Sequence, residues 1–239
     1  MPAALIATSH GTGDPAGQAA VARLVAALAE AAPDRAVLPA HVDVQQPDVP
    51  AALGAAPDGP AVILPLLVSA GYHVHVDLDR AARDAGRPAA VADALGPDRR
   101  LAALLASRLD LAPDDAVVLI AAGSSDARAQ TACREAAALL AEEIGRPVGL
   151  AYLSAAEPRA DALVRELRAA GPGRRIVGVS YLLAPGYFQS LAERCSADLV
   201  TGPLLPADGP TPEALVAIAL DRATAAAADR IRPGRAPGC

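Results

Sequence analysis

The sequence predicts an α/β protein built from two tandem-duplicated domains, each with a parallel sheet. Short apolar runs alternate with alanine-rich amphipathic stretches, which is typical of βα units. The order of these segments in the first half of the 239 residues returns in the second half. Hydrophobic residues make up 53% of the chain and aromatic residues only 2%, so Ala, Val, Leu and Ile must form the core, as in a helix-covered parallel sheet. The high apolar content excludes a disordered chain.

Four strands and four helices are predicted in alternation in the first half. The first helix has favourable entry chemistry, because Asp14 can act as its N-cap and Pro15 fits the first helical position, where no N–H is needed. The predicted strands are Ala3–Thr8, Ala36–Val42, Ala61–Val68 and Pro88–Ala92, and the predicted helices are Asp14–Ala31, Asp48–Ala56, His75–Ala85 and Asp98–Leu109.

A duplication explains the second half. Landmark residues recur there in the same order and at nearly constant spacing, pairing Gly11 with Gly123, Pro47 with Pro158, Tyr72 with Tyr187 and Arg108 with Arg222. Four landmarks in order are hard to obtain by chance, which indicates a tandem repeat. We therefore expect an N-terminal domain at 1–113 that carries the site, a degenerate repeat at 114–231 and a disordered tail at 232–239.

Composition excludes several classes of function. The net charge of −6 argues against a binder of phosphate backbones, and the scarcity of aromatic residues argues against a stacking surface for single-stranded nucleic acid. Cys133, Cys195 and Cys239 are far apart, which favours neither a disulfide framework nor a structural zinc site. The longest apolar run, Ala61–Ala70, is too short for a membrane helix. We expect a cytoplasmic protein with no nucleic-acid or membrane partner.

All four histidines lie in the first half, so the two copies differ in their chemistry. When the two copies are aligned, each candidate histidine or aspartate of the first half corresponds to an alanine, a serine or a phenylalanine in the second half. The second half has Ala122 for His10, Ser154 for Asp43, Phe188 for His73, Ser190 for His75 and Ala192 for Asp77. This difference is expected if one copy bears a site and the other supports it.

Three of the candidates follow successive predicted strands. His10 ends the first strand, Asp43 ends the second and His73 follows the third. The carboxyl ends of parallel strands open on one edge of the sheet, so we expect the rings of His10 and His73 to meet there beside Asp43. Two imidazoles and a carboxylate suit Fe, Co, Ni or Zn and leave coordination positions open. The Gly11-Thr12-Gly13 turn also predicts free backbone N–H groups for an anion.

Simpler interpretations remain open for several of these residues. A single histidine near a strand end is more often a surface or capping residue. His41 is expected to be a core or rim histidine, because its strand parity is opposite to that of Asp43. His75 fits a surface position at a helix start as well as a role beside His73. Asp43 can cap its own turn, and Asp77 can complement a helix dipole.

Several motifs resemble one known family. They are Ser9-His10-Gly11, the pair Asp43 and Pro47, and the segment Pro65-Leu66-Leu67 followed by Gly71-Tyr72-His73-x-x-x-Asp77-Leu78. Together they resemble the class II tetrapyrrole chelatases, in particular the sirohydrochlorin chelatases. The similarity covers essentially the whole chain, because the longer bacterial members are similar duplications whose second half has lost the site.

This resemblance implies the insertion of Fe²⁺ or Co²⁺, as a substrate, into the anionic tetrapyrrole sirohydrochlorin to make sirohaem. It matches His10 and His73 to the metal-handling histidines, and it requires no organic cofactor. Asp43 is expected to act with them in catalysis by orienting a histidine or holding charge. A monomer is expected, because a duplicated chain can do what a single-copy relative would need a dimer to do. The residues expected to contact the macrocycle are Ser9, Gly11, Thr12, Ser69 and Gly71.

Other functions compete with this one. The same reaction can serve cobalamin-type synthesis with cobalt or nickel, and only the metal preference separates these cases. A non-catalytic carrier of metal or tetrapyrrole is a third possibility, since a fold does not guarantee activity. A phosphate or nucleotide binder ranks last, because the chain has neither G-x-x-x-x-G-K nor G-x-G-x-x-G.

Overall fold

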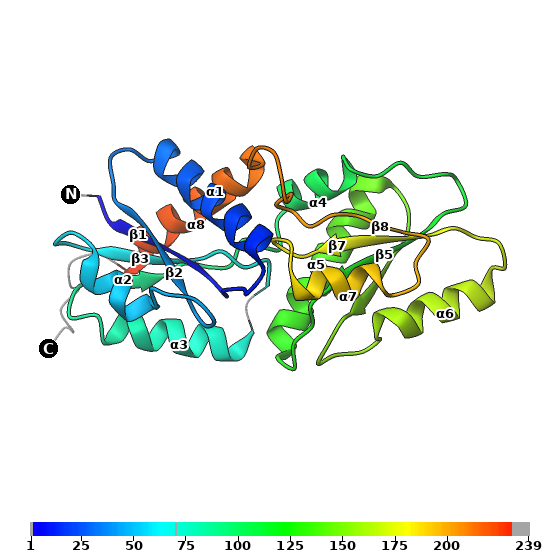
Figure 1. Cartoon of the computed structure of the whole chain (residues 1–239), viewed down its shortest axis with the longest axis horizontal. Helices are drawn as coiled ribbons and strands as arrows, with labels where there is room; N and C mark the ends of the chain where they lie inside the picture. The colour runs from blue at the N-terminus through cyan, green and yellow to red at the C-terminus, as the bar shows by residue number, and fades with distance from the viewer. Residues whose placement is uncertain (1, 70, 231–239) are drawn as a thin grey trace, which may run out of the picture.

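The computed structural model describes residues 2–69 and 71–230, with the side chains of residues 72–75 and 229–230 left out of that description. Two lobes lie side by side, each with a four-stranded parallel sheet covered by helices (Figure 1). The strand order is β2-β1-β3-β4 in the first sheet and β6-β5-β7-β8 in the second. The predicted fold class is therefore confirmed. The predicted tail at 232–239 lies outside the described residues.

The strands of the two sheets correspond one to one. In the first lobe they are β1 (Ala4–Ser9), β2 (Val37–His41), β3 (Ala61–Pro65) and β4 (Ala89–Val91). In the second lobe they are β5 (Ala116–Ala121), β6 (Val148–Tyr152), β7 (Ile176–Tyr181) and β8 (Leu199–Val200).

The helices also alternate with the strands throughout the chain. They are α1 (Pro15–Ala31), α2 (Val49–Ala55), α3 (Tyr72–Arg83), α4 (Arg99–Ala106), α5 (Ala127–Ile144), α6 (Ala160–Ala170), α7 (Tyr187–Glu193) and α8 (Glu213–Arg230).

Local chemistry sets the helix starts in two instructive cases. Asp14 caps α1 as predicted, since its carboxylate accepts from the Gly17 N–H at 2.9 Å. The predicted start of α3 at His75 is wrong, because the helix already begins at Tyr72. Gly71 supplies an extended N-cap backbone, and no proline or glycine interrupts the residues that follow it.

One hydrophobic core runs through both lobes on the side of the sheets that faces α1, α4, α5 and α8. It joins Leu5 of β1 and Leu64 of β3 to Leu119 of β5 and Val179 of β7, with Leu101 of α4 between the lobes. The opposite face of each sheet has a separate core. The lobes therefore share buried apolar surface, which resists their separation.

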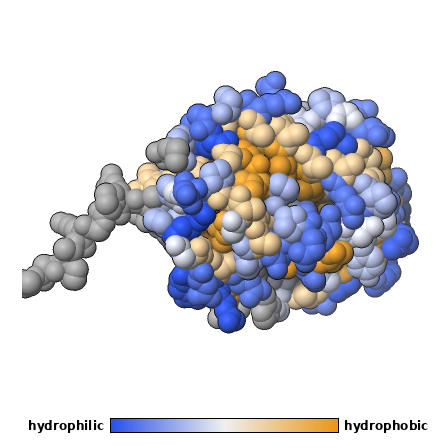
Figure 2. All heavy atoms as spheres, turned by 60° about the vertical axis from the view of Figure 1, so that its left-hand side comes forward, coloured by the Kyte–Doolittle hydropathy of each residue, from blue (hydrophilic) through white to orange (hydrophobic). Residues whose placement is uncertain are grey.

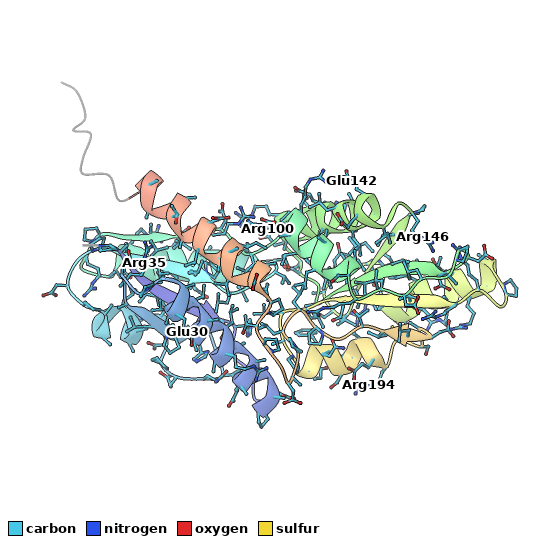
Figure 3. The ribbon with its side chains drawn as sticks, turned by 90° about the horizontal axis from the view of Figure 1, so that it is seen from above. Glu30, Arg35, Arg100, Glu142, Arg146 and Arg194 are labelled. Carbon is cyan, nitrogen blue, oxygen red and sulfur yellow. The ribbon has the colours of Figure 1, made fainter. Side chains whose placement is uncertain are left out.

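The two halves exchange their last helices. The helix α4 from the first half packs against α5, and α8 from the second half packs against α1, β3 and β4. Figure 3 shows α8 beside α1 above the first lobe, with Arg100 of α4 between the lobes. Arg100 donates to the Asp221 carboxylate of α8 at 2.6 Å. The spatial lobes therefore do not follow the repeat, because the segments 1–113 and 114–231 each contribute a helix to the other lobe.

Two arginines at equivalent positions of the repeat hold the exchanged helices in place. Arg108, just after α4, donates to the carbonyl oxygens of Pro203 and Leu204 at 2.6 and 2.7 Å. Arg222 of α8 donates to the carbonyl oxygens of Ala94 and Pro97, both at 3.2 Å. Arg108 thus binds the loop after β8, the last strand of the second lobe. Arg222 binds the loop after β4, the last strand of the first lobe. In both cases the helix crosses onto the lobe whose loop its arginine binds. The repeated arginine seen in the sequence is thus a repeated structural contact.

The surface mixes polar and apolar regions. Figure 2 shows hydrophobic patches between hydrophilic side chains on the side that it presents. No helix within residues 2–69 and 71–230 combines the length and the apolar character that a membrane crossing requires.

Candidate functional site

The loops after β1 and β2 bring His10 and Asp43 together. The Asp43 N–H donates to the His10 carbonyl at 2.9 Å, and both residues are exposed. Gly11 allows this approach, because a Cβ atom on it would lie 1.9 Å from the Asp43 carbonyl oxygen and because its φ is +93°. The expected juxtaposition of these two loops at one sheet edge is present, and an imidazole and a carboxylate are both open to solvent there.

One oxygen of the Asp43 carboxylate already has a local partner. Asp43 Oδ1 accepts from the Val44 N–H at 2.7 Å. The residue therefore caps its own turn, which was one of the two interpretations of Asp43 given by the sequence. Val44 has a φ of 66°, and Ala155 at the same place in the second half has a φ of 52°. Because both copies adopt this backbone, the strain belongs to the repeated loop rather than to the chemistry of one site.

His73 lies in the first turn of α3, one residue after the helix start at Tyr72. The side chains of His73 and His75 lie outside the described residues, so the meeting of the His10 and His73 rings stays a prediction. Among the described side chains, no group of three or more His, Cys, Asp or Glu residues could hold a metal ion.

Ser9 does not offer its hydroxyl to the exposed edge. Its Oγ lies 2.9 Å from Nδ1 of His41, and the two residues are only 4% and 9% exposed. Burial lowers the pKa of His41, because the charged ring loses hydration. His41 also lines a groove of about 440 Å³ between α1 and β2, with Gln18 and Gln45 and several apolar residues. His41 is thus the core or rim histidine that strand parity predicted, and Ser9 hydrogen-bonds to it, while the expected contact of Ser9 with the macrocycle stays a prediction.

The turn at residues 11–13 satisfies much of its own backbone. The Thr12 N–H donates to Gln45 Oε1 at 2.9 Å, and the Thr12 carbonyl accepts from Gln18 Nε2 at 2.8 Å. The Asp14 N–H donates to Thr12 Oγ1, and the Asp14 carboxylate occupies the N-terminus of α1. The prediction of a free anion site at this turn is therefore wrong for the Thr12 N–H and for the helix end. The sequence carried no local signal that the Thr12 N–H would donate to Gln45.

The loop after β3 is held against the second lobe. A Cβ atom on Gly71 would lie 3.1 Å from Oγ of Ser124. Burial raises the pKa of the Cys133 thiol of α5, while a hydrogen bond with the Ser69 hydroxyl acts in the opposite direction. Ser69 and Gly71, both expected to contact the macrocycle, thus border the boundary between the lobes.

Tyr181 was missed by sequence reasoning. Its hydroxyl donates to the Val68 carbonyl at 3.2 Å, which ties the end of β7 to the loop that leads to His73. Burial raises the pKa of the Tyr181 phenol well above its usual range, so this hydroxyl remains a donor. The backbone before α3 is thereby positioned by the second lobe.

The arrangement defines a two-lobed protein with the fold of the chelatases, as solved structures show. SirB from Bacillus subtilis with Fe³⁺ matches with a TM-score of 0.78 and 20% identity over 96% of this chain and 99% of that chain. SirB from Bacillus subtilis subspecies spizizenii in complex with cobalt matches with a TM-score of 0.76 and 19% identity over 98% of both chains. CbiX, described as the terminal enzyme for biosynthesis of sirohaem in denitrifying bacteria, matches with a TM-score of 0.65 and 23% identity over 92% of this chain and 98% of that chain.

The sequence also matches a family profile. The profile of the CbiX family covers residues 4–112 and 116–192, and the chain belongs to this family. No curated protein matches the chain.

Proposed function

We propose that this chain is a sirohydrochlorin chelatase that inserts Fe²⁺ or Co²⁺ into sirohydrochlorin. The match of the CbiX profile to both halves carries the proposal. The exposed His10 and Asp43, joined through their backbones at the sheet edge, supply suitable chemistry. The solved relatives with bound Fe³⁺ and cobalt support a site that accepts either metal.

The reaction exchanges one divalent cation for two protons. Two pyrrole N–H groups lose their protons, and the ring nitrogens bind the metal in their place. A protein group at the ring face must therefore bind the cation weakly enough to release it and also accept protons. Neutral imidazole does both near pH 7, where its ordinary pKa lies slightly below the ambient pH.

Three residues take the central roles in this proposal. His10 and His73 bind the incoming metal and present it to the ring face, and their rings accept pyrrole protons as the metal leaves. Asp43 contributes negative charge beside His10, and its Oδ1 also accepts from the Val44 N–H in the turn. The surface against which the macrocycle lies is formed by Ser9, Gly11, Thr12, Ser69 and Gly71.

Anaerobic absorbance spectroscopy tests the proposal. Sirohydrochlorin mixed with Fe²⁺ or Co²⁺ should metallate much faster with the protein than with the His10→Ala, His73→Ala double variant. Equal rates would refute the chelatase. Stoichiometric retention of metal or macrocycle without turnover would replace it with a carrier, and the ratio of Fe²⁺ to Co²⁺ rates would distinguish sirohaem from cobalamin-type synthesis.

We also propose that the protein works as a monomer in the cytoplasm. The two lobes already share one core and exchange helices within one chain, so a second copy is not needed to pair them. Light scattering should give the mass of one chain, about 24.0 kDa.

A further inference from the structure

Two of the few aromatic residues lie exposed at the start of α7. Tyr187 is 69% exposed and Phe188 is 38% exposed. Their rings form an edge-to-face pair with centroids 5.5 Å apart. By contrast, Tyr152 and Tyr181 are buried. Because the chain has only one Phe and four Tyr, an exposed pair of rings is unusual for its composition and indicates a surface that meets an apolar partner.

The two residues that precede this pair, Pro185 and Gly186, lie against the segment that follows His10. A Cβ atom on Gly186, just before α7, would lie 3.3 Å from Oγ1 of Thr12. A Cβ atom on Gly17 would lie 2.4 Å from the Pro185 carbonyl oxygen. The turn into α7 therefore touches the turn into α1, and α7 begins close to the boundary between the lobes (Figure 1). The helix that carries the exposed rings thus begins where the second lobe touches the loop after β1.

The repeat shows that Phe188 stands where the first copy has a histidine. Both α3 and α7 begin with a tyrosine that follows a glycine, and the next residue is His73 in α3 and Phe188 in α7. The second copy has kept the helix start and replaced the metal-binding side chain with an apolar ring. A ring at this place cannot bind metal, but it can contact the conjugated substrate that the metal must enter.

We propose that Tyr187 and Phe188 form a platform against one face of the tetrapyrrole macrocycle, which leaves the opposite face toward His10 and His73. This inference rests on the proposed function, since it names how the same site holds its organic substrate. The macrocycle has flat, apolar faces and charged carboxylates at its rim. Aromatic side chains pack well on such a face, and Tyr187 adds a hydroxyl at the wet edge. Metal insertion needs one face free, so a platform on one side and imidazoles on the other suit the reaction.

If the platform exists, loss of its rings should weaken binding of the macrocycle and leave binding of the metal unchanged. In the Tyr187→Ala, Phe188→Ala double variant, the Kd and KM for sirohydrochlorin should rise about 5- to 10-fold. The binding of Co²⁺ alone, measured by calorimetry, should stay unchanged. Phe188→Leu, which keeps apolar volume without a ring, should fall between the wild type and Phe188→Ala. Leu199→Ala is the matched control, because Leu199 is 40% exposed on β8 and lies outside the platform. It should leave macrocycle binding unchanged.

Titration of sirohydrochlorin absorbance without metal tests the platform separately from catalysis. Unchanged macrocycle affinity in the folded double variant, with its fold checked by circular dichroism, would overturn the platform while turnover by the wild type leaves the chelatase standing. Loss of binding in the double variant, with a wild type that binds but never metallates, would support the platform and refute the chelatase. A wild-type dimer that becomes a monomer in the double variant would show that the rings instead contact a second copy, and would overturn the platform.

Discussion

The two lobes share their framework and differ in their chemistry. After β1, Thr12 binds the Asp14 N–H through its hydroxyl and the Gln18 amide through its carbonyl. After β5, the same two bonds recur in Ser124, Asp126 and Gln130. The second lobe nevertheless has Ala122 in place of His10. The duplicated polar contacts therefore build the loops, whereas candidates for catalysis are the polar residues that only one copy has.

The largest effect should come from His10, because it distinguishes the two lobes. If His10 binds the metal as proposed, His10→Ala should lower the rate of metal insertion at least about 100-fold, since water does not replace a lost ligand with equal geometry. Ala122→His, the matched change in the second lobe, should leave the rate within about twofold of wild type. Steady-state absorbance assays measure both. A comparable loss in the two variants would show that the lobes contribute equally.

A second comparison uses the glycines that let neighbouring loops touch. A Cβ atom would lie 1.9 Å from the Asp43 carbonyl oxygen at Gly11 and 1.8 Å from the Ser154 carbonyl oxygen at Gly123. Gly11→Ala and Gly123→Ala should therefore each lower the free energy of unfolding by about 2–4 kcal/mol. Only Gly11→Ala should also lower kcat, because it displaces His10 and Asp43. Urea denaturation and kinetic assays of both variants separate the two effects.

The paired arginines should show a smaller effect that is nearly symmetrical. Arg108→Ala and Arg222→Ala each leave two loop carbonyls without a charged donor, at a cost of about 1–3 kcal/mol. The bonds of Arg108 are shorter, whereas Arg222 also forms an ion pair with Asp98 at 3.6 Å, so the two costs should be similar. Lysine at either position should restore only part of the stability, because it lacks the planar guanidinium fork. Urea midpoints that do not move would show that the helix exchange is held by the apolar core alone.

The smallest expected effect concerns His41, which has Tyr152 as its counterpart. Burial keeps the folded pKa of His41 below the ordinary 6.5, so the unfolded chain binds a proton first as the pH falls. The contribution of His41 to stability is thus present above pH 6.5 and is lost as the pH falls from there through the folded pKa. The Tm of the wild type should drop more between pH 7.5 and 5.5 than that of His41→Gln. Parallel pH dependences would contradict this assignment.

Much of the framework follows from local sequence patterns. The alternation of apolar runs predicted every strand of the first lobe, because side-chain periodicity depends on near neighbours. Asp14 and Pro15 predicted the start of α1 for the same reason. The start of α3 was placed three residues too late, because the helix already begins at Tyr72 with Gly71 as its N-cap.

The amino-acid sequence by itself determined the alternating elements, the duplication and the restriction of histidines to one copy, since these are properties of spacing along the chain. Only the tertiary structure decided that α4 and α8 cross between the lobes, that the Thr12 N–H donates to Gln45, and that the turn into α7 lies against the other lobe's loop. Those outcomes depend on contacts between residues far apart in the chain. They arise because apolar faces and unpaired polar groups are satisfied wherever the folded chain brings partners together.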